Sequence, residues 1–328
     1  MYLLFIEKGT KVLSQQGHLC YINPIRFFNS DYGFGCRKFL INNASIISVL
    51  DISQLSVFHN AMTYPCVLLV GKERLNNNNI HYRRLDKLSE LQIINSIKPI
   101  ITPSNEIASD PEYRFILYVS SELRRVVNKI DSNKKTIVSS EFDIARGLAN
   151  AKVNLRGSAY KALKSTNVRK YYIEGDLKDI DSAFGDTFKD EMIILPRTVE
   201  FLQAMIKGKD IVCLDRIYYL TPKNKVDLKY VLGVINSLIT NVWFEYYYKT
   251  TKVAGNYFDL NGNQIGSIPI PLAKPSQQKE IISLVDTVLS KKKTNPQTDT
   301  SAEEKKNDKL VYELYRLEPE EIRIVEEQ

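Results

Sequence analysis

The sequence predicts an α/β half-domain, comparable to the closing half of a doubly wound sheet, followed by an α+β domain and a C-terminal helix. Three observations support this fold class. Helix-like and strand-like segments alternate first, short apolar runs separated by turn residues follow, and helical periodicity returns near the C-terminus. We place the first boundary at Ile100–Pro103. The expected parts are residues 1–104, residues 105–290, a linker at 291–309 and a helix at 310–328.

The first part has the order of elements that is expected of the second half of a doubly wound sheet. Apolar residues at helical spacing predict a helix at Tyr2–Val12, and a short apolar strand follows at Leu19–Ile22. A second helix is predicted at Arg37–Asn42, before strands at Ile46–Ile52 and Cys66–Val70. Sheets of this type bind their cofactor at the ends of the first strands, which this order lacks. We therefore expect the chain to act as part of a larger enzyme.

The second part has short strands interrupted by helices. Helical patterns occupy Ile116–Asn128, Leu228–Tyr247 and Gln277–Leu289, and Asp227 is a suitable cap for the second of them. Asn261-Gly262 between apolar flanks predicts a β-hairpin at Phe258–Ile265. The charged, Thr- and Ser-rich residues 291–309 are expected to form a mobile linker.

The composition limits the classes of protein to which the chain can belong. Its 44% hydrophobic and 25% charged residues are typical of a soluble globular protein, and no apolar run approaches the ~20 residues that span a bilayer. The four cysteines form no C-x-x-C pair, and there are three histidines. Structural zinc is therefore not favoured, no metal site is expected, and free thiols indicate a cytoplasmic protein.

The charge favours a polyanionic partner. The formal net charge is +7, and tyrosines alternate with cations at Arg169–Tyr172, Arg216–Tyr219 and Tyr246–Lys249. Cations supply phosphate contacts, while tyrosines supply flat surfaces and hydroxyl donors. The alternative for each of these segments is an amphipathic strand with half of its tyrosines in a core.

Several motifs together resemble the later motifs of N6-adenine DNA methyltransferases. They are Gly17–Pro24 (GHLCYINP), Phe27–Gly33 (FFNSDYG), Arg37–Leu40 (RKFL) and the segment Ile47–Val70. This part is similar to the Type IIG (Eco57I-like) restriction-modification enzymes and their TaqI-like methyltransferase relatives. The resemblance implies that residues 1–104 are the C-terminal half of a Rossmann-like catalytic domain.

The motifs further along the chain resemble the TaqI-like C-terminal specificity domain. They are Asp143–Gly147 (DIARG), Leu232–Ser237 (LGVINS) and Ile265–Pro271 (IGSIPIP), and the tail at Tyr312–Ile322 is similar to the end of such chains. The resemblance implies that residues 105–290 form a domain that recognises a DNA target from the major-groove side.

The chain departs from the family at the catalytic motifs. The Asn-Pro-Pro-Tyr tetrapeptide, which in the family holds a flipped adenine, has no counterpart, because Asn23-Pro24 is followed by Ile25-Arg26. We expect that this chain alone neither binds S-adenosylmethionine, the cofactor of the full-length family enzyme, nor transfers a methyl group. The resemblance makes Phe58 the candidate contact to the flipped base, with Tyr64 in reserve. The alternative is that Phe58 is a core residue.

DNA contacts are expected from basic and amide side chains of the second part, since such groups bind phosphates and base edges. If the domain folds as in the family, one surface would present them all. The candidates are Arg146, Arg156, Lys161, Lys164, Arg169, Lys170, Arg197, Lys249, Lys252 and Asn256, the last three around Gly255.

The sequence therefore favours sequence-specific recognition of double-stranded DNA, as the C-terminal part of a restriction-modification adenine methyltransferase. An alternative is an interaction module that docks on a separate methyltransferase subunit through its exposed half sheet. A complete enzyme with a divergent catalytic loop and a binder of single strands through the tyrosines are further alternatives.

Overall fold

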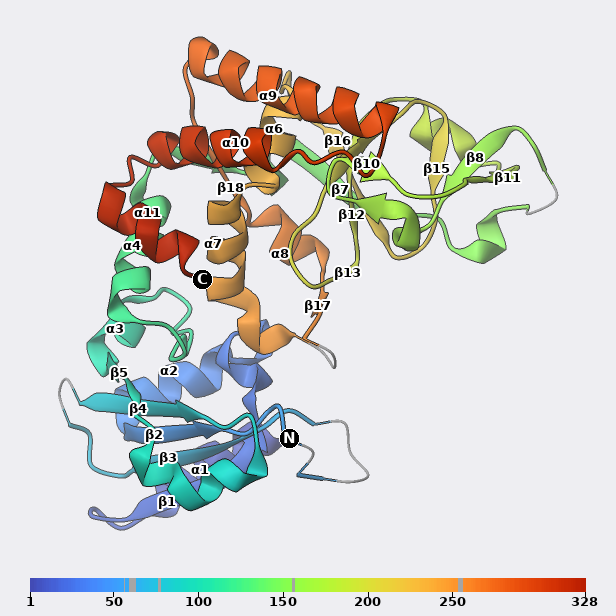
Figure 1. Cartoon of the computed structure of the whole chain (residues 1–328). Coiled ribbons are helices and arrows are strands. Elements are labelled where there is room, and N and C mark those ends of the chain that lie inside the picture. Colours follow the sequence, from blue (N-terminus) through green and yellow to red (C-terminus); the bar gives the residue numbers. More distant parts are fainter. Residues whose placement is uncertain (56, 59–62, 76–77, 155–156, 253–255) are drawn as a thin grey trace. The chain divides into compact units, whose positions relative to one another are not determined.

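The computed structural model describes residues 1–55, 57–58, 63–75, 78–154, 157–252 and 256–328 (Figure 1). The chain forms two compact units, Met1–Arg124 and Arg125–Gln328. The division falls within helix α4 (Ser121–Ser132), and so it lies beyond the expected boundary after residue 104. Both units combine helices with strands, which confirms the mixed α and β character predicted from the sequence.

The first unit contains one five-stranded sheet with the strand order β1-β3-β2-β4-β5. β2 and β4 run parallel, and the other neighbours are antiparallel. The strands predicted from the sequence correspond to β1, β2 and β3. Strand β4 was not predicted, because its sequence is polar. The segment expected as a domain boundary forms the edge strand β5. The strands are β1 (His18–Pro24), β2 (Ser45–Asp51), β3 (Pro65–Gly71), β4 (Asn79–Arg84) and β5 (Ile100–Pro103).

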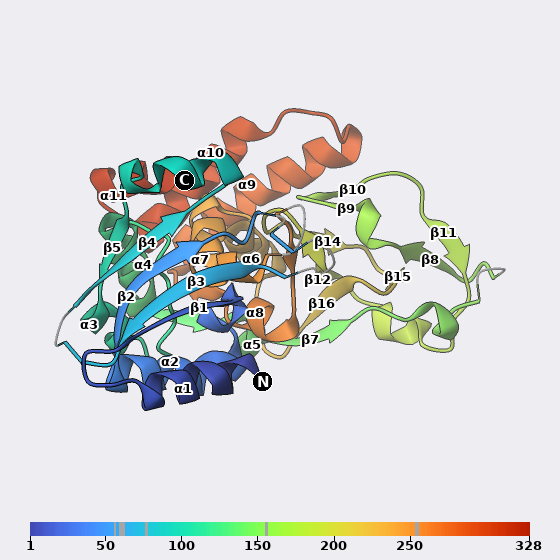
Figure 2. The ribbon, with the colours of Figure 1, turned by 90° about the horizontal axis from the view of Figure 1, so that it is seen from below.

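Helices α1 and α2 pack against each other and against β1 and β2, and Figure 2 shows them side by side next to the sheet. Ile6 of α1 and Leu40 of α2 are fully buried in one cluster with Ile46 and Leu68 of the sheet, as their helical and strand spacing predicts. The helices of the unit are α1 (Tyr2–Val12), α2 (Phe34–Asn43), α3 (Ser104–Ser109) and the 3-10 helices η1 (Ile25–Phe28), η2 (Asp31–Gly33) and η3 (Leu88–Ser96).

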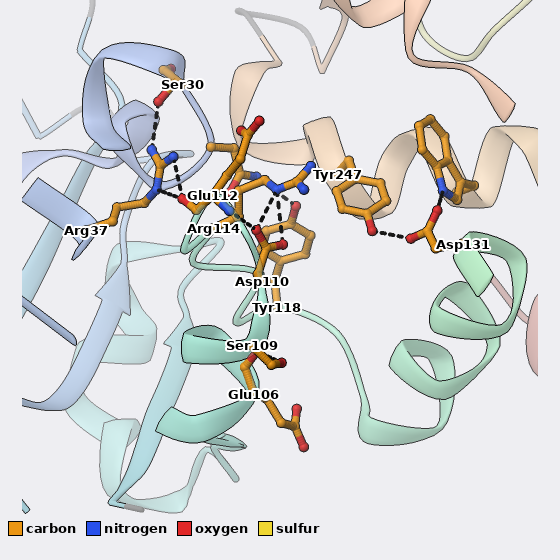
Figure 3. Close-up of polar contacts among 12 residues, drawn as sticks. Ser30, Arg37, Glu106, Ser109, Asp110, Glu112, Arg114, Tyr118, Asp131 and Tyr247 are labelled. Carbon is orange, nitrogen blue, oxygen red and sulfur yellow. Dashed lines mark hydrogen bonds and ion pairs between the residues drawn. The ribbon is translucent and has the colours of Figure 1, made fainter. Parts of the chain in front are cut away.

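A fully buried arginine connects distant segments of the first unit (Figure 3). Arg37 of α2 donates hydrogen bonds to the backbone carbonyls of Phe27 and Ser30, each at 2.7 Å, and of Glu112, at 2.9 and 3.1 Å. Buried carbonyls need such partners, because leaving them without one costs free energy. The arginine of the RKFL motif therefore has a structural role.

The second unit contains one four-stranded and one three-stranded sheet, with the orders β14-β12-β16-β7 and β11-β8-β15. Three two-stranded pairs, β10-β9, β13-β17 and β18-β6, complete the described strands. The strands are β6 (Lys135–Ile137), β7 (Phe142–Arg146), β8 (Tyr160–Leu163), β9 (Val168–Arg169), β10 (Tyr172–Ile173), β11 (Lys178–Ile180), β12 (Met192–Pro196), β13 (Thr198–Val199), β14 (Met205–Lys207), β15 (Ile211–Cys213), β16 (Ile217–Pro222), β17 (Phe258–Asp259) and β18 (Pro269–Pro271).

Several helices of the second unit pack on its strands: α6 contacts β12 and β14, α8 contacts β7, and α9 contacts β10. In Figure 3, Asp131 of α4 accepts a hydrogen bond from Tyr247 of α7, and Trp243 donates a second at 3.0 Å. The helices are α5 (Val138–Glu141), α6 (Leu228–Ile235), α7 (Leu238–Tyr248), α8 (Gly262–Gly266), α9 (Pro275–Thr294), α10 (Ser301–Leu314), α11 (Pro319–Glu326) and the 3-10 helices η4 (Asn150–Lys152), η5 (Ser165–Asn167), η6 (Gly185–Phe188) and η7 (Lys249–Thr251).

Two predictions within residues 228–265 differ from the structure. Asn261 accepts a hydrogen bond from the backbone amide of Gln264 at 3.0 Å and begins α8, so the predicted hairpin at Phe258–Ile265 is wrong. The helix predicted at Leu228–Tyr247 is divided in two, because Ser237 caps a second helix after Asn236 ends the first. Asp227 caps α6 as predicted, by accepting from Lys229 and Tyr230.

The segment expected as a mobile linker, residues 291–309, is mostly helical. Its first residues end α9, and its last ones form most of α10, which packs against α9 and α7. The buried Asn307 donates to the carbonyl of Gly233 in α6 at 2.9 Å, and Lys291 forms an ion pair with Glu303 at 2.7 Å. Polar composition concealed this helix, because α10 buries only a narrow stripe of its surface.

Candidate nucleic-acid interface

Three arginines lie at one end of the four-stranded sheet in the second unit. Arg146 is the last residue of β7, Arg197 directly follows β12, and Arg216 directly precedes β16. These strands are antiparallel neighbours, with Pro196 opposite Ile217 and Arg146 opposite Tyr218. The ends of β7 and β12 therefore meet the start of β16. We call Arg146, Arg197 and Arg216 the arginine cluster.

Gly147 lets the chain after Arg146 approach the turn between β15 and β16. A Cβ atom at Gly147 would lie 2.1 Å from the carbonyl oxygen of Leu214. Any residue with a side chain would therefore force the backbone to shift. The amide of Gly147 donates to Ile217 at 2.9 Å, and that of Leu148 donates to Cys213 at 2.8 Å. This close backbone pairing sets Arg146 beside Asp215.

Asp215 links two members of the arginine cluster. Its Oδ1 accepts from Nη2 of Arg146 at 2.5 Å and from the backbone amide of Arg216 at 2.9 Å. These two hydrogen bonds, the amide first, lower the pKa of the Asp215 carboxyl below its ordinary value. Arg216 has a φ of 69°, and its side chain is exposed. The turn thus presents one arginine held by a carboxylate and a second one projecting into solvent.

Asp259 holds the third arginine. Its Oδ1 lies 2.8 Å from Nε of Arg197, and its Oδ2 accepts a hydrogen bond from Nη2 at 2.9 Å. This contact raises the pKa of the arginine, so the guanidinium stays charged. The pair forms because β13 and β17 are antiparallel, with Thr198 opposite Asp259. The side chains keep 33% and 39% of their exposure, so the arginine is held and still accessible.

The segment before β17 carries the remaining cations of this surface. Lys252 lies over the ring of Phe258, 4.5 Å from its centroid, and forms an ion pair with Glu245 at 3.6 Å. Burial lowers the pKa of Lys252, opposed by Glu245 and, more weakly, by Glu200 next to β13. Lys249 also pairs with Glu245, at 3.4 Å, and Asn256 is exposed with a φ of 65°.

The structure divides the expected DNA contacts into two groups. Arg146, Arg197, Lys249, Lys252 and Asn256 lie around the arginine cluster and β17, as described above. The others belong to different elements, and Arg156 lies outside the described residues. Lys161 pairs with Asp179 across β8 and β11, Lys164 is exposed before η5, Arg169 pairs with Glu174 beyond β10, and Lys170 pairs with Glu304 of α10.

Arg216 was absent from the expected contacts, although its segment was singled out for alternating cations and tyrosines. Tyr218 in that segment is buried, as the core alternative predicted, whereas Tyr219 is half-buried. The signal that could have identified Arg216 is its neighbour Asp215, since Asp is common in tight turns, where its side chain bonds to nearby backbone amides.

Phe58 and Tyr64, the expected contacts to a flipped base, lie before β3 in the first unit. The side chain of Phe58 is 45% exposed, so the alternative of a core residue is wrong. The ring of Tyr64 is half-buried, and the guanidinium of Arg26 lies 5.1 Å from its centroid. Phe58 is therefore accessible to a ligand, whereas the guanidinium of Arg26 lies over one face of the Tyr64 ring.

Comparison with known families shows what two parts of the chain are similar to. Residues 1–58 match the family described as Eco57I restriction-modification methylase, and residues 153–270 match the TaqI-like C-terminal specificity domain. The resemblance seen in the sequence motifs is thus confirmed. The arginine cluster belongs to the part that matches the specificity domain, except for Arg146, which precedes the matched residues.

Two curated relatives are similar to parts of the chain. The Type II restriction enzyme and methyltransferase RM.Eco57I of Escherichia coli is 40% identical over 76 residues, 23% of this chain and 8% of the relative. The Type II methyltransferase M.AccI of Acinetobacter calcoaceticus is 30% identical over 117 residues, 35% of this chain and 21% of the relative. The matched region is thus less than a quarter of either relative.

Two solved structures share the fold. The Type IIL restriction-modification enzyme MmeI in complex with DNA has a TM-score of 0.56 and 10% identity, over 99% of this chain and 50% of that one. The DrdV–DNA complex has a TM-score of 0.51 and 12% identity, over 88% of this chain and 39% of that one.

In the described parts of this chain, every helix is too short or too polar to cross a membrane.

Proposed function

We propose that this chain is the DNA-recognising part of a restriction-modification adenine methyltransferase, and that its second unit binds double-stranded DNA sequence-specifically. The observation that carries the proposal is the arginine cluster, which three neighbouring strands present at one end of a sheet. The match of residues 153–270 to a specificity domain supports it. We propose that the recognition domain lies within residues 105–290, of which residues 105–124 belong to the first compact unit.

The chemistry of the cluster suits duplex DNA. Arginine presents a planar fork of donors that matches phosphate oxygens and the guanine edge. Its carboxylate partners do not prevent binding, because exposed ion pairs contribute only about 0–1 kcal/mol and can be exchanged for contacts with DNA. Lys249 and Asn256 extend the same surface, whereas the side chain of Lys252 is only 9% exposed. Lys252, Lys161, Lys164, Arg169, Lys170 and Arg156 remain proposed contacts.

For the first unit we propose the C-terminal half of a Rossmann-like methyltransferase sheet. β1 pairs only with β3 among the described strands, so its other edge is available to a further strand. Methyl transfer and S-adenosylmethionine binding would need that further part. Phe58, with Tyr64 in reserve, would contact the flipped adenine.

A second candidate function is docking on a separate methyltransferase subunit. Leu4, Phe5 and Val12 of α1 are 67%, 56% and 67% exposed, and α1 contacts the edge strand β1. Exposed apolar groups beside an unpaired strand edge favour association. A molecular mass that rises with protein concentration, and that falls when Phe5 is replaced by Lys, would support this function.

The main proposal is tested by binding the chain to a randomised duplex pool at two salt concentrations and sequencing the retained DNA. We expect a short motif that is still enriched at the higher salt. Retention that salt abolishes, without enrichment, would indicate phosphate contacts alone and contradict sequence-specific recognition. No retention at either salt would favour the docking function.

A further inference from the structure

We propose that Arg197 reads a guanine in the major groove of the target and that Asp259 is the positioning residue that aims it. This inference rests on the proposed function of the second unit as a DNA-recognition domain. It goes further by naming the base, the reading side chain and the group that orients that side chain.

The contact with Asp259 leaves the correct part of the guanidinium accessible. The carboxylate faces Nε and Nη2, at 2.8 and 2.9 Å, which form one edge of the guanidinium. Among the residues that the structure describes, no hydrogen bond or ion pair engages the neighbouring edge, made by Nη1 and the second hydrogen of Nη2, and the side chain is 33% exposed. Two parallel donors on that edge match O6 and N7 of guanine, the acceptor pair that distinguishes this base in the major groove.

The backbone of Arg197 is held as firmly as its side chain. Its amide donates to the carbonyl of Arg216 at 2.7 Å, and its carbonyl accepts from the amide of Leu260 at 2.8 Å. A side chain fixed from both ends loses little rotamer freedom on binding, so its fork discriminates between bases. Arg216 differs, because no carboxylate pairs with its side chain among the residues that the structure describes; it suits a phosphate contact.

Asp259 places a negative charge on a surface that is proposed to bind DNA. A surface that bound only phosphates would bind more strongly without Asp259, since a carboxylate repels the DNA backbone. Because the Asp259 carboxylate contacts Nε and Nη2 of Arg197, it instead orients the guanidinium. An orienting role predicts opposite changes when Asp259 is neutralised: affinity for random DNA stays equal or rises, while discrimination falls.

The test begins with the motif that the full chain selects from a randomised duplex pool. Each guanine of that motif is replaced in turn by 7-deazaguanine, which lacks the N7 acceptor, and binding is measured for the unmodified chain and for Arg197→Met. We expect one position at which 7-deazaguanine weakens binding on the order of ten-fold or more. At that position Arg197→Met should bind both duplexes equally.

Asp259→Asn tests the positioning role, and Arg323→Ala, an exposed arginine of α11, is the matched control. Asp259→Asn should lose preference for the Arg197-dependent guanine without losing affinity for random duplex, while Arg323→Ala should select the original motif unchanged. Melting temperatures of all variants confirm that they fold, and the 7-deazaguanine measurement on the unmodified chain needs no variant.

Two results would overturn the inference. If Arg197→Met binds all duplexes more weakly but selects the same motif, Arg197 contacts phosphate, and the proposed recognition function stands without it. If the unmodified chain selects no motif at all, the proposed function fails and this inference fails with it.

Discussion

The guanidinium of Arg37 donates two hydrogen bonds to the backbone carbonyl of Glu112, 75 residues further along the chain, at 2.9 and 3.1 Å. The same side chain donates to the carbonyls of Phe27 and Ser30 and is fully buried (Figure 3). One charged side chain thus satisfies three carbonyls from two distant segments.

We predict that Arg37→Met destabilises the first unit by about 3–5 kcal/mol, because the buried carbonyl of Phe27 and the part-buried carbonyls of Ser30 and Glu112 lose their charged donor. Denaturant unfolding followed by tyrosine fluorescence would measure the change. Lys38→Ala, at the exposed neighbouring position of the same helix, should change the unfolding free energy by less than about 0.5 kcal/mol. Equal effects of the two substitutions would contradict the structural role of Arg37.

Gly147→Ala should displace Arg146 from Asp215. The added methyl group would lie 2.1 Å from the Leu214 carbonyl, so the backbone must shift, and we expect a loss of about 2–3 kcal/mol in stability together with weaker DNA binding. Gly208→Ala is the matched control in the same unit, since its Cβ meets only the Ile211 side chain at an ordinary 3.5 Å. Thermal melting and duplex titration of both variants would check this; a well-tolerated Gly147→Ala would exclude the close approach.

Asp308→Asn should raise stability at neutral pH. Asp308 accepts a hydrogen bond from the amide of Leu238 at the start of α7, and burial raises its pKa above the ordinary value. The folded state therefore binds a proton more tightly than the unfolded state, and stability declines as pH rises from about 3.8 through the folded pKa. The amide keeps an acceptor for Leu238 but removes the buried charge.

Melting curves at several pH values between 4 and 7 would test this dependence. The melting temperature of Asp308→Asn relative to the unmodified chain should increase as pH rises through that window and then level off. A constant difference across the window would mean that Asp308 does not titrate differently in the folded and unfolded states.

Asn307→Ala should destabilise the second unit by about 1–2 kcal/mol. The buried amide of Asn307 donates to Gly233, one of the last carbonyls of α6, which would be left without this partner. Lys305→Ala, on the exposed side of α10, is the control and should have little effect. If residues 291–309 behaved as a mobile linker, both substitutions would be equally neutral in unfolding experiments.

The elements that the sequence predicted correctly have local causes. The helix at Tyr2–Val12 follows from its apolar spacing, and the start of α6 follows from a carboxylate at Asp227 that accepts the first free amides. The errors arise where a local signal has two solutions. Asn261-Gly262 can form a hairpin turn or a helix cap. In the structure Phe258–Asp259 pairs with β13, and Asn261 caps α8.

The sequence named individual cations of the candidate site but not the residues that contact them. A strand followed by Arg146 and Gly147 is visible in the sequence, and so is the chemical suitability of Arg197. The carboxylates that hold these arginines were not predicted, because an acidic residue far along the chain cannot be paired with a cation from the sequence alone.

The sequence by itself established the resemblance to restriction-modification methyltransferases, the helices and strands with strong periodicity, and the supply of cations in the second unit. Only the tertiary structure decided which cations lie on one surface and with which carboxylates they pair. Arg197 and Asp259 are 62 residues apart and face each other because β13 pairs with β17, and Arg146 and Asp215 meet because Gly147 admits a close backbone approach. Strand pairing is non-local, so the geometry of the site depends on contacts that no local pattern encodes.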